Sequence, residues 1–176
     1  MDRVIFPDVM SVNKELRHQY ERFPANAIRA ALLCPENIES YIALGGSFRK
    51  ANLSDFDREF VILRLAKLSE CGYEIMQHAH LAQSVGITPD ILDKLLYDKG
   101  NVLDSKQNAL LNYVDACFFH VKASDGVFFS LKQYYADEQL ATLTLLIGFY
   151  WMTAVLVENL EVPLDATPTS WTRLLS

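Results

Sequence analysis

The residues best suited to chemistry lie in one short segment, C-G-Y-E-I-M-Q-H, which holds Cys71, Glu74 and His78. If this segment is helical, Cys71 and His78 project within roughly 20° of each other, with Glu74 between them. The backbones of Cys71 and His78 are then about 10 Å apart, too far for contact, but Glu74 is one turn from each. A carboxylate between a thiol and an imidazole predicts a proton-relay site.

The protonation of Cys71 has two opposing influences. The N–H groups at a helix start favour a thiolate and lower the thiol pKa, whereas the Glu74 carboxylate raises it. The sequence leaves open which effect is larger. Taken singly, a cysteine is often a small buried apolar residue, and a histidine is often a hydrogen-bonded core residue. Three titratable residues on one face of an apolar helix favour a functional role, because burying them costs free energy.

The same residues do not predict a metal or cofactor site. His78 and His80 are two residues apart, so on a helix their side chains diverge by about 200°, and His80 is expected to be structural or exposed. The cysteines Cys34, Cys71 and Cys117 are widely spaced and odd in number, which predicts neither a disulfide framework nor a paired zinc site. Reduced thiols favour a cytoplasmic location, and the N-terminus has no secretory pattern.

Composition limits the partners. Sixteen basic residues are scattered among twenty-two acidic ones, giving a net charge of −6, so no nucleic-acid surface is expected. The chain is 51% apolar, which suggests surface hidden in an oligomer. Residues 140–157 carry no charge and approach the length of a membrane span, but acidic residues flank them. We expect no membrane partner, and a helix buried on nearly all sides.

Residues typical of helix starts and ends recur along the chain. They predict an all-α protein, with residues 1–176 forming a single domain. The expected N-caps include Ser54, Thr88 (followed by Pro89) and Asp104. Helices are predicted over residues 26–33, 37–50, 55–68, 71–85, 89–98, 104–121 and 124–135, and from residue 137 to a stop at 162–163, followed by a tail. The connections are short, so consecutive helices should pack as antiparallel neighbours.

Two segments resemble a known family. Residues 53–87 contain an Arg-Glu pair, a twelve-residue step from Glu59 to Cys71, and then C-x-Y-x-x-x-x-H ending at His78. Residues 143–165 are similar to the closing helix of the same family and its trailing V-P-L-D. The pattern resembles the carboxymuconolactone decarboxylase family, which includes the alkylhydroperoxidase D-like proteins, with a family core of about residues 24–165.

The resemblance implies an all-α bundle that assembles into trimers or hexamers. In the peroxidase branch a C-x-x-C pair reduces peroxides, while a glutamate and a histidine relay protons. Glu59, Cys71 and His78 would match that glutamate, the first cysteine and the histidine. Glu74 stands where the second cysteine would be, and a dithiol cycle needs two sulfurs. The two-cysteine peroxidase mechanism is therefore not favoured.

The sequence instead favours acid–base chemistry on a small organic acid or lactone, as in the decarboxylase branch. His78 is predicted to be the acid/base, Glu74 and Glu59 its orienting or relay partners, and Cys71 a residue that lines the pocket. Tyr73 is expected to project to another side and pack.

Arg58 and Arg64 are basic residues of the core motif that could bind a substrate carboxylate. Each is expected rather to be a helix-surface charge or an ion-pair partner. Two alternatives stay open: a peroxidase or redox sensor that uses Cys71 alone, and an oligomeric protein that keeps the fold without the chemistry.

Overall fold

Helices alone form the regular secondary structure of residues 3–169, the part of the chain that the computed structural model describes. They are α1 (Lys14–Arg22), α2 (Asn26–Ala31), α3 (Ile38–Ser47), α4 (Asp55–Leu68), α5 (Gly72–Ala82), the 3₁₀ turn η1 (Gln83–Val85), α6 (Pro89–Tyr97), α7 (Ser105–His120), α8 (Asp125–Lys132) and α9 (Asp137–Asn159). The predicted all-α class is confirmed.

The predicted capping residues begin their helices. The side chains of Ser54, Thr88 and Ser124 each accept a hydrogen bond from the backbone N–H three residues on. Asp104 forms a reciprocal capping box with Gln107 at the start of α7. These caps satisfy N–H groups that the helix itself leaves without a partner, so the corresponding starts were readable from the sequence.

The helix ends and the N-terminal region differ from the predictions. α2, α3 and α8 end two or three residues earlier than expected. α1 was not predicted, because its sequence K-E-L-R-H-Q-Y-E-R is mostly polar and none of its residues is buried. Asn13 nevertheless caps it by accepting a hydrogen bond from the Leu16 backbone N–H at 2.9 Å.

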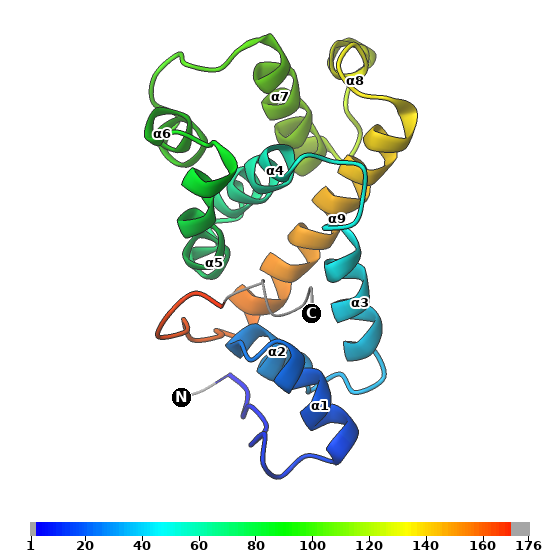
Figure 1. Cartoon of the computed structure of the whole chain (residues 1–176), viewed down its shortest axis with the longest axis vertical. Helices are drawn as coiled ribbons and strands as arrows, with labels where there is room; N and C mark the ends of the chain where they lie inside the picture. Colours follow the sequence, from blue (N-terminus) through cyan, green and yellow to red (C-terminus); the bar gives the residue numbers. More distant parts are fainter. Residues whose placement is uncertain (1–2, 170–176) are drawn as a thin grey trace.

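α4 is the central helix of the larger group formed by α4 to α8 (Figure 1). Its consecutive residues Phe60, Val61, Ile62 and Leu63 are all buried, so every side of the helix contacts protein. α5, α6, α7 and α9 pack against it. α1, α2 and α3 form a second group, and α9 runs from one group to the other (Figure 1).

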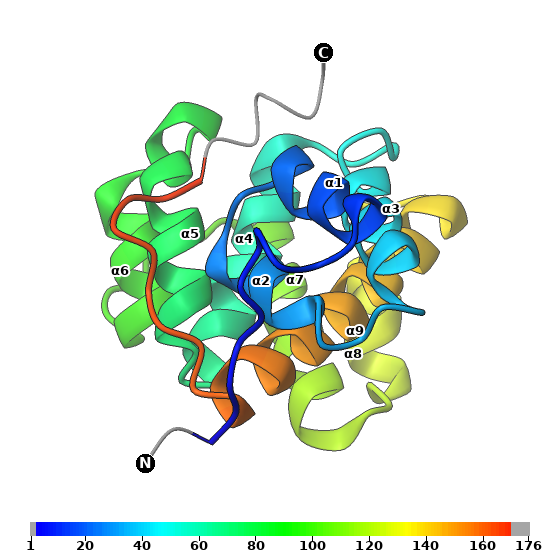
Figure 2. The same cartoon turned by 90° about the horizontal axis from the view of Figure 1, so that it is seen from below.

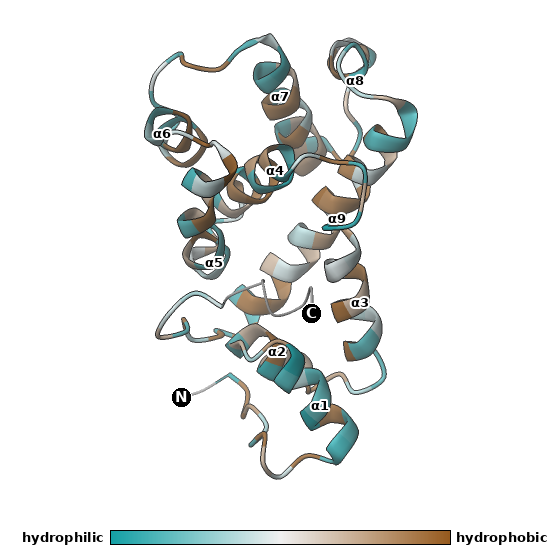
Figure 3. Ribbon diagram, in the orientation of Figure 1, coloured by the Kyte–Doolittle hydropathy of each residue, from teal (hydrophilic) through white to brown (hydrophobic). Residues whose placement is uncertain are grey.

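α9 is less enclosed than expected. Among the described residues it alone is long and apolar enough to cross a membrane, yet half of its most apolar stretch is buried inside the chain. The ribbon of α9 carries strongly apolar stretches (Figure 3), and Leu145, Met152 and Val155 are each about half exposed. The prediction of burial on nearly all sides is therefore wrong for a single chain: α9 is a core helix with one open apolar face.

The segment after α9 is fixed in place up to residue 169. It runs along α5 beside the N-terminal segment (Figure 2). The Asn26 side chain donates to the Pro163 carbonyl at 3.1 Å, and Arg3 forms an ion pair with Glu161 at 2.9 Å. Part of the expected tail is thus a strap, residues 160–169, held across α2 and α5. The rest of the predicted tail lies outside the described residues.

Candidate active site

Glu59 and His78 meet in the interior, because α4 and α5 pack side by side. The Glu59 Oε2 and His78 Nδ1 atoms are 2.7 Å apart, and both side chains are essentially inaccessible to solvent. Glu59 lies among the buried apolar residues of α4, where its carboxylate needs a charged or hydrogen-bonding partner. The two residues that the sequence predicted as partners are therefore in direct contact.

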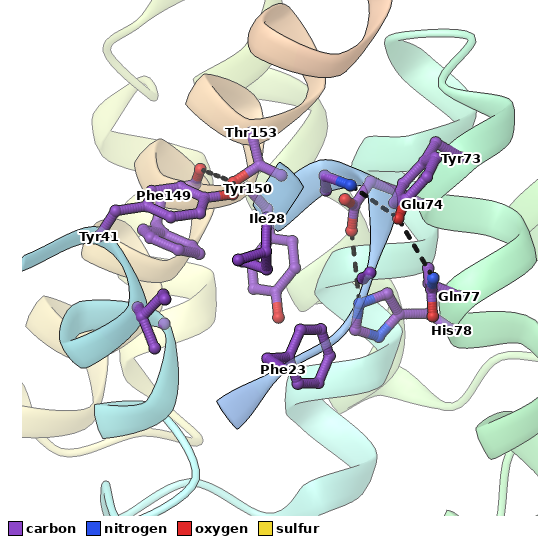
Figure 4. A pocket seen from close by; sticks show the side chains of 14 residues that line it. Phe23, Ile28, Tyr41, Tyr73, Glu74, Gln77, His78, Phe149, Tyr150 and Thr153 are labelled. Atoms are coloured by element: carbon purple, nitrogen blue, oxygen red, sulfur yellow. Dashed lines mark hydrogen bonds and ion pairs between the residues drawn. The ribbon is translucent and has the colours of Figure 1, made fainter. Parts of the chain in front are cut away.

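Glu74 completes the group from one turn earlier on α5. Its Oε2 atom lies 3.3 Å from the His78 Nε2 atom, as Figure 4 shows. The imidazole of His78 thus has a carboxylate at each ring nitrogen, which favours the form in which both nitrogens carry a proton. Glu74 contacts His78, as the helical spacing predicted.

The electrostatics of this triad favour a charged histidine. Burial alone would lower the pKa of His78, but the charge and hydrogen bond of Glu59, with those of Glu74, raise it to about 9. Burial would likewise raise the pKa of Glu59, but the charges of His78, Arg58 and Arg49 hold that pKa below its usual value. At neutral pH the pair is therefore an imidazolium and a carboxylate.

A small cavity of about 50 Å³ lies against this triad. Glu74 and His78 form part of its wall (Figure 4). Its other lining residues are mainly apolar and aromatic: Phe23, Ala25, Ala27, Ile28, Tyr41, Ile42, Gly45, Tyr73, Gln77, Phe149, Tyr150 and Thr153. An apolar cavity with a few convergent titratable groups is typical of a site for a small molecule.

Tyr73 also lines the cavity, which differs from the expectation that it packs on another side. Its hydroxyl accepts a hydrogen bond from the Ala27 backbone N–H at 3.0 Å and donates one to Asp165. Gln77 donates to the same carboxylate at 2.7 Å and accepts from the Thr169 backbone N–H at 2.8 Å. The strap therefore fixes two side chains of the cavity wall.

Cys71 does not line the cavity, contrary to prediction. It is the N-cap residue of α5, is fully buried, and packs with Ala30 and Val157 in an apolar cluster. Burial raises the pKa of its thiol most strongly. A hydrogen bond from the Glu74 backbone lowers that pKa by less, and the Glu74 charge and the side chain of Glu158 raise it further. Burial thus decides the competition that the sequence left open.

The other two cysteines do not form a disulfide with Cys71. All three are free thiols. Cys34 is exposed, whereas Cys117 is buried in the main hydrophobic cluster, away from the cluster that holds Cys71. The described residues therefore provide no second sulfur bonded to Cys71.

The two arginines of the core motif are ion-pair partners and do not line the cavity. Arg58 pairs with Asp55 at 2.7 Å and with Glu59 at 3.3 Å. Arg64 contacts Asp98 and Asp115, each at 2.7 Å. Both guanidinium groups are buried rather than at the helix surface, and neither is placed to bind a ligand in the cavity.

The histidines and acidic residues of the described part form no group of three or more that could hold a metal ion. His80 is exposed on α5, as expected. The sequence analysis missed Tyr150 and Asp165 as parts of the site. Tyr150 lies within a long apolar run, so its direction could not be read there, and Asp165 entered only through the V-P-L-D resemblance.

No protein-family model matches the sequence, and no curated protein is similar to it in sequence. Solved structures do share its fold. A peroxidase-related protein from Ralstonia eutropha JMP134, described as an alkylhydroperoxidase AhpD core, superposes with a TM-score of 0.79 at 13% identity, over 98% of this chain and 94% of that one.

Two further structures agree. A protein of unknown function from Agrobacterium tumefaciens, provisionally classed as an AhpD antioxidant-defence protein, gives a TM-score of 0.71 at 19% identity, over 77% of this chain and 95% of that one. A peroxidase-related protein from Silicibacter sp. TM1040 gives 0.73 at 16% identity, over 93% and 88%. The chain thus has the AhpD-like helical fold that the sequence motif predicted.

Proposed function

We propose that this chain is an AhpD-like enzyme that moves a proton to or from a small organic acid or lactone. The observation that carries the proposal is the buried group of Glu59, His78 and Glu74 at the wall of the cavity. Burying three titratable side chains is costly, and the group is placed where a ligand could use it. An AhpD-like fold alone does not determine the reaction.

In a decarboxylation, the bond from carbon to the carboxyl group breaks and its electron pair stays on the carbon as CO₂ leaves. That carbon then takes a proton from the site. The His78 imidazolium supplies the proton through Glu74, and Glu59 holds the ring in position. A proton from water restores the imidazolium, so no oxidant or reductant is consumed.

The alternative is a peroxidase that uses Cys71, as the names of the similar structures suggest for those proteins. Three observations weigh against it here. Cys71 is fully buried, its thiol pKa is raised, and Glu74 occupies the position of a second cysteine. A thiol that stays protonated is a poor nucleophile.

A non-catalytic oligomeric protein is the third candidate. Such a protein would have no need of a buried imidazolium at a cavity wall, so the triad weighs against it.

Association itself is compatible with catalysis. We propose that the chain forms a homo-oligomer through the exposed face of α9, where Leu145 and Met152 border an apolar surface hollow. We propose a cytoplasmic location, in keeping with its free thiols.

A panel of small organic acids and lactones tests the proposed activity, with product formation followed by NMR. We expect the His78→Ala variant to lose turnover and the matched Cys71→Ser variant to retain it. Circular dichroism checks that both variants fold. Loss of turnover in the cysteine variant alone would overturn the acid–base proposal in favour of thiol chemistry.

A further inference from the structure

Tyr150 brings a second functional group to the cavity from α9. Its side chain is buried, lines the cavity, and meets the imidazole of His78 edge-on, with ring centroids 5.4 Å apart and an interplanar angle of 84°. Figure 4 shows the ring between the Tyr41–Thr153 side of the cavity and the Glu74–His78 side. Tyr150 is therefore close to the proposed proton-transfer group without belonging to it.

The hydroxyl of Tyr150 differs from its neighbours in the cavity wall. The Tyr41 hydroxyl is hydrogen-bonded to the Thr153 hydroxyl at 2.9 Å. The Tyr73 hydroxyl is hydrogen-bonded to the Ala27 backbone and to Asp165 in the strap. Tyr150 makes no side-chain hydrogen bond to another residue of the described chain. A hydroxyl inside a cavity with no partner in the wall is available to a ligand.

The hydroxyl is also held in its donor form. Burial, followed by the charges of Glu74 and Glu59, raises the pKa of Tyr150 well above its ordinary value. The group therefore keeps its proton at neutral pH and can donate it in a hydrogen bond. Its natural acceptor is an oxygen that gains negative charge during a reaction.

The charge of the cavity wall selects the kind of ligand. Among the described residues, the lining includes the carboxylate of Glu74 and the imidazolium of His78, but no lysine or arginine. A carboxylate ligand would meet Glu74, and the described wall offers no cation besides the His78 imidazolium, which Glu59 and Glu74 already contact. A volume of about 50 Å³ also limits the ligand to a few heavy atoms, since a cavity known to bind benzene has a volume of about 150 Å³.

We propose that Tyr150 is a catalytic residue that hydrogen-bonds the carbonyl oxygen of a small uncharged substrate while Glu74 exchanges a proton at the neighbouring carbon. This inference rests on the proposed acid–base function. It keeps the lactones of the proposed substrate class, replaces the acids by uncharged carbonyl compounds such as small esters and ketones, and makes the step a proton exchange rather than a decarboxylation. It assigns the Tyr150 hydroxyl to the carbonyl oxygen and the Glu74 carboxylate to the neighbouring carbon of one reacting unit.

The step balances without a further reagent. The Glu74 carboxylate takes a proton from the carbon beside the carbonyl, and the electron pair of the broken C–H bond moves onto the carbonyl oxygen as an enolate. The Tyr150 O–H stabilises that oxygen through its hydrogen bond. Return of the proton from Glu74 to carbon completes the exchange.

Acetone and acetate make a matched pair of probes, because they have nearly the same shape and differ in charge. In D₂O near neutral pH, ¹H NMR follows loss of the acetone methyl signal by proton–deuteron exchange, and saturation-transfer NMR follows binding of both probes. We expect the protein to bind acetone in preference to acetate and to accelerate exchange. Tyr150→Phe should slow that exchange about 100-fold, as for loss of a donor to a developing oxyanion, and Glu74→Gln should abolish it.

Tyr113→Phe is the control, because its hydroxyl bonds Thr144 at 2.7 Å outside the cavity. It should exchange acetone protons at the wild-type rate. If Tyr150→Phe stays within about threefold of wild type while Glu74→Gln is inactive, the role of Tyr150 is wrong but acid–base catalysis stands. If acetate binds as well as acetone, or the wild type exchanges no proton of acetone, the substrate class is wrong. The proposed function is judged separately, on the panel of acids and lactones.

Discussion

Glu59 and His78 are nineteen residues apart in the sequence, yet their side chains meet at 2.7 Å in the interior, where neither is exposed. This contact joins α4 to α5 and leaves the other ring nitrogen of His78 for Glu74. It makes the histidine a charged group at neutral pH inside an otherwise apolar region. The stability of the fold and the proposed chemistry therefore depend on the same pair.

The first prediction concerns pH and stability. The pKa of His78 is about 9 in the folded chain and close to 6.5 when unfolded, so its charged contacts stabilise the fold fully below pH 6.5 and are lost as pH rises through 9. The difference corresponds to roughly 3 kcal/mol. Urea unfolding at pH 6 and pH 9.5 measures it. The His78→Gln variant is the control, and an equal pH dependence in both proteins would contradict the assignment.

The second prediction concerns the thiols. Because Cys34 is exposed while Cys71 and Cys117 are buried, a thiol reagent near pH 8 should label Cys34 quickly and the other two only after unfolding. Mass spectrometry of the labelled peptides identifies the sites. Cys34→Ser should remove the fast phase. Rapid labelling of Cys71 in the native protein would contradict its burial and favour the peroxidase alternative.

The third prediction concerns the strap. The Asp165 carboxylate accepts hydrogen bonds from the Asn26 backbone, Tyr73 and Gln77, so Asp165→Asn should lower the free energy of unfolding by about 1–3 kcal/mol. Urea denaturation measures the loss. Asp93→Asn, at an exposed position on α6, should change stability little. Equal stability of the two variants would show that the hydrogen bonds of Asp165 do not hold the strap in place.

The fourth prediction concerns assembly. A charge on the open face of α9, as in Leu145→Asp or Met152→Asp, should shift the protein to monomers in light scattering. Ile5→Asp is the control, because Ile5 is also strongly exposed but lies on the N-terminal segment. A monomeric wild type, or an oligomer unaffected by both α9 variants, would rule out this interface.

The helices and the Glu59–His78–Glu74 group were predictable because their signals are local. Capping residues such as Ser54 and Asp104 mark helix starts, and the spacing from Glu74 to His78 is one helical turn. The partnership of Glu59 with His78 came from the family motif. The contact of these three residues agrees with their predicted partnership, although their catalytic roles stay a prediction.

The remaining features depend on contacts that local patterns do not encode. The burial of Cys71 comes partly from Val157 and Val162, far along the chain. Asp165 accepts a hydrogen bond from Gln77 only because the strap packs back against α5. The direction of Tyr150 was hidden, because α9 is apolar on all sides and has no periodic polar face.

The most direct test of the central claim is the ionisation state of His78 in the native protein. In ¹⁵N NMR of histidine-labelled protein near pH 7.5, the account predicts that both ring nitrogens of His78 carry protons, as in an imidazolium. The His78→Gln variant assigns the signals, and Glu59→Gln should lower the pH at which the ring loses its proton. A neutral His78 ring at that pH in the wild-type protein would contradict the account.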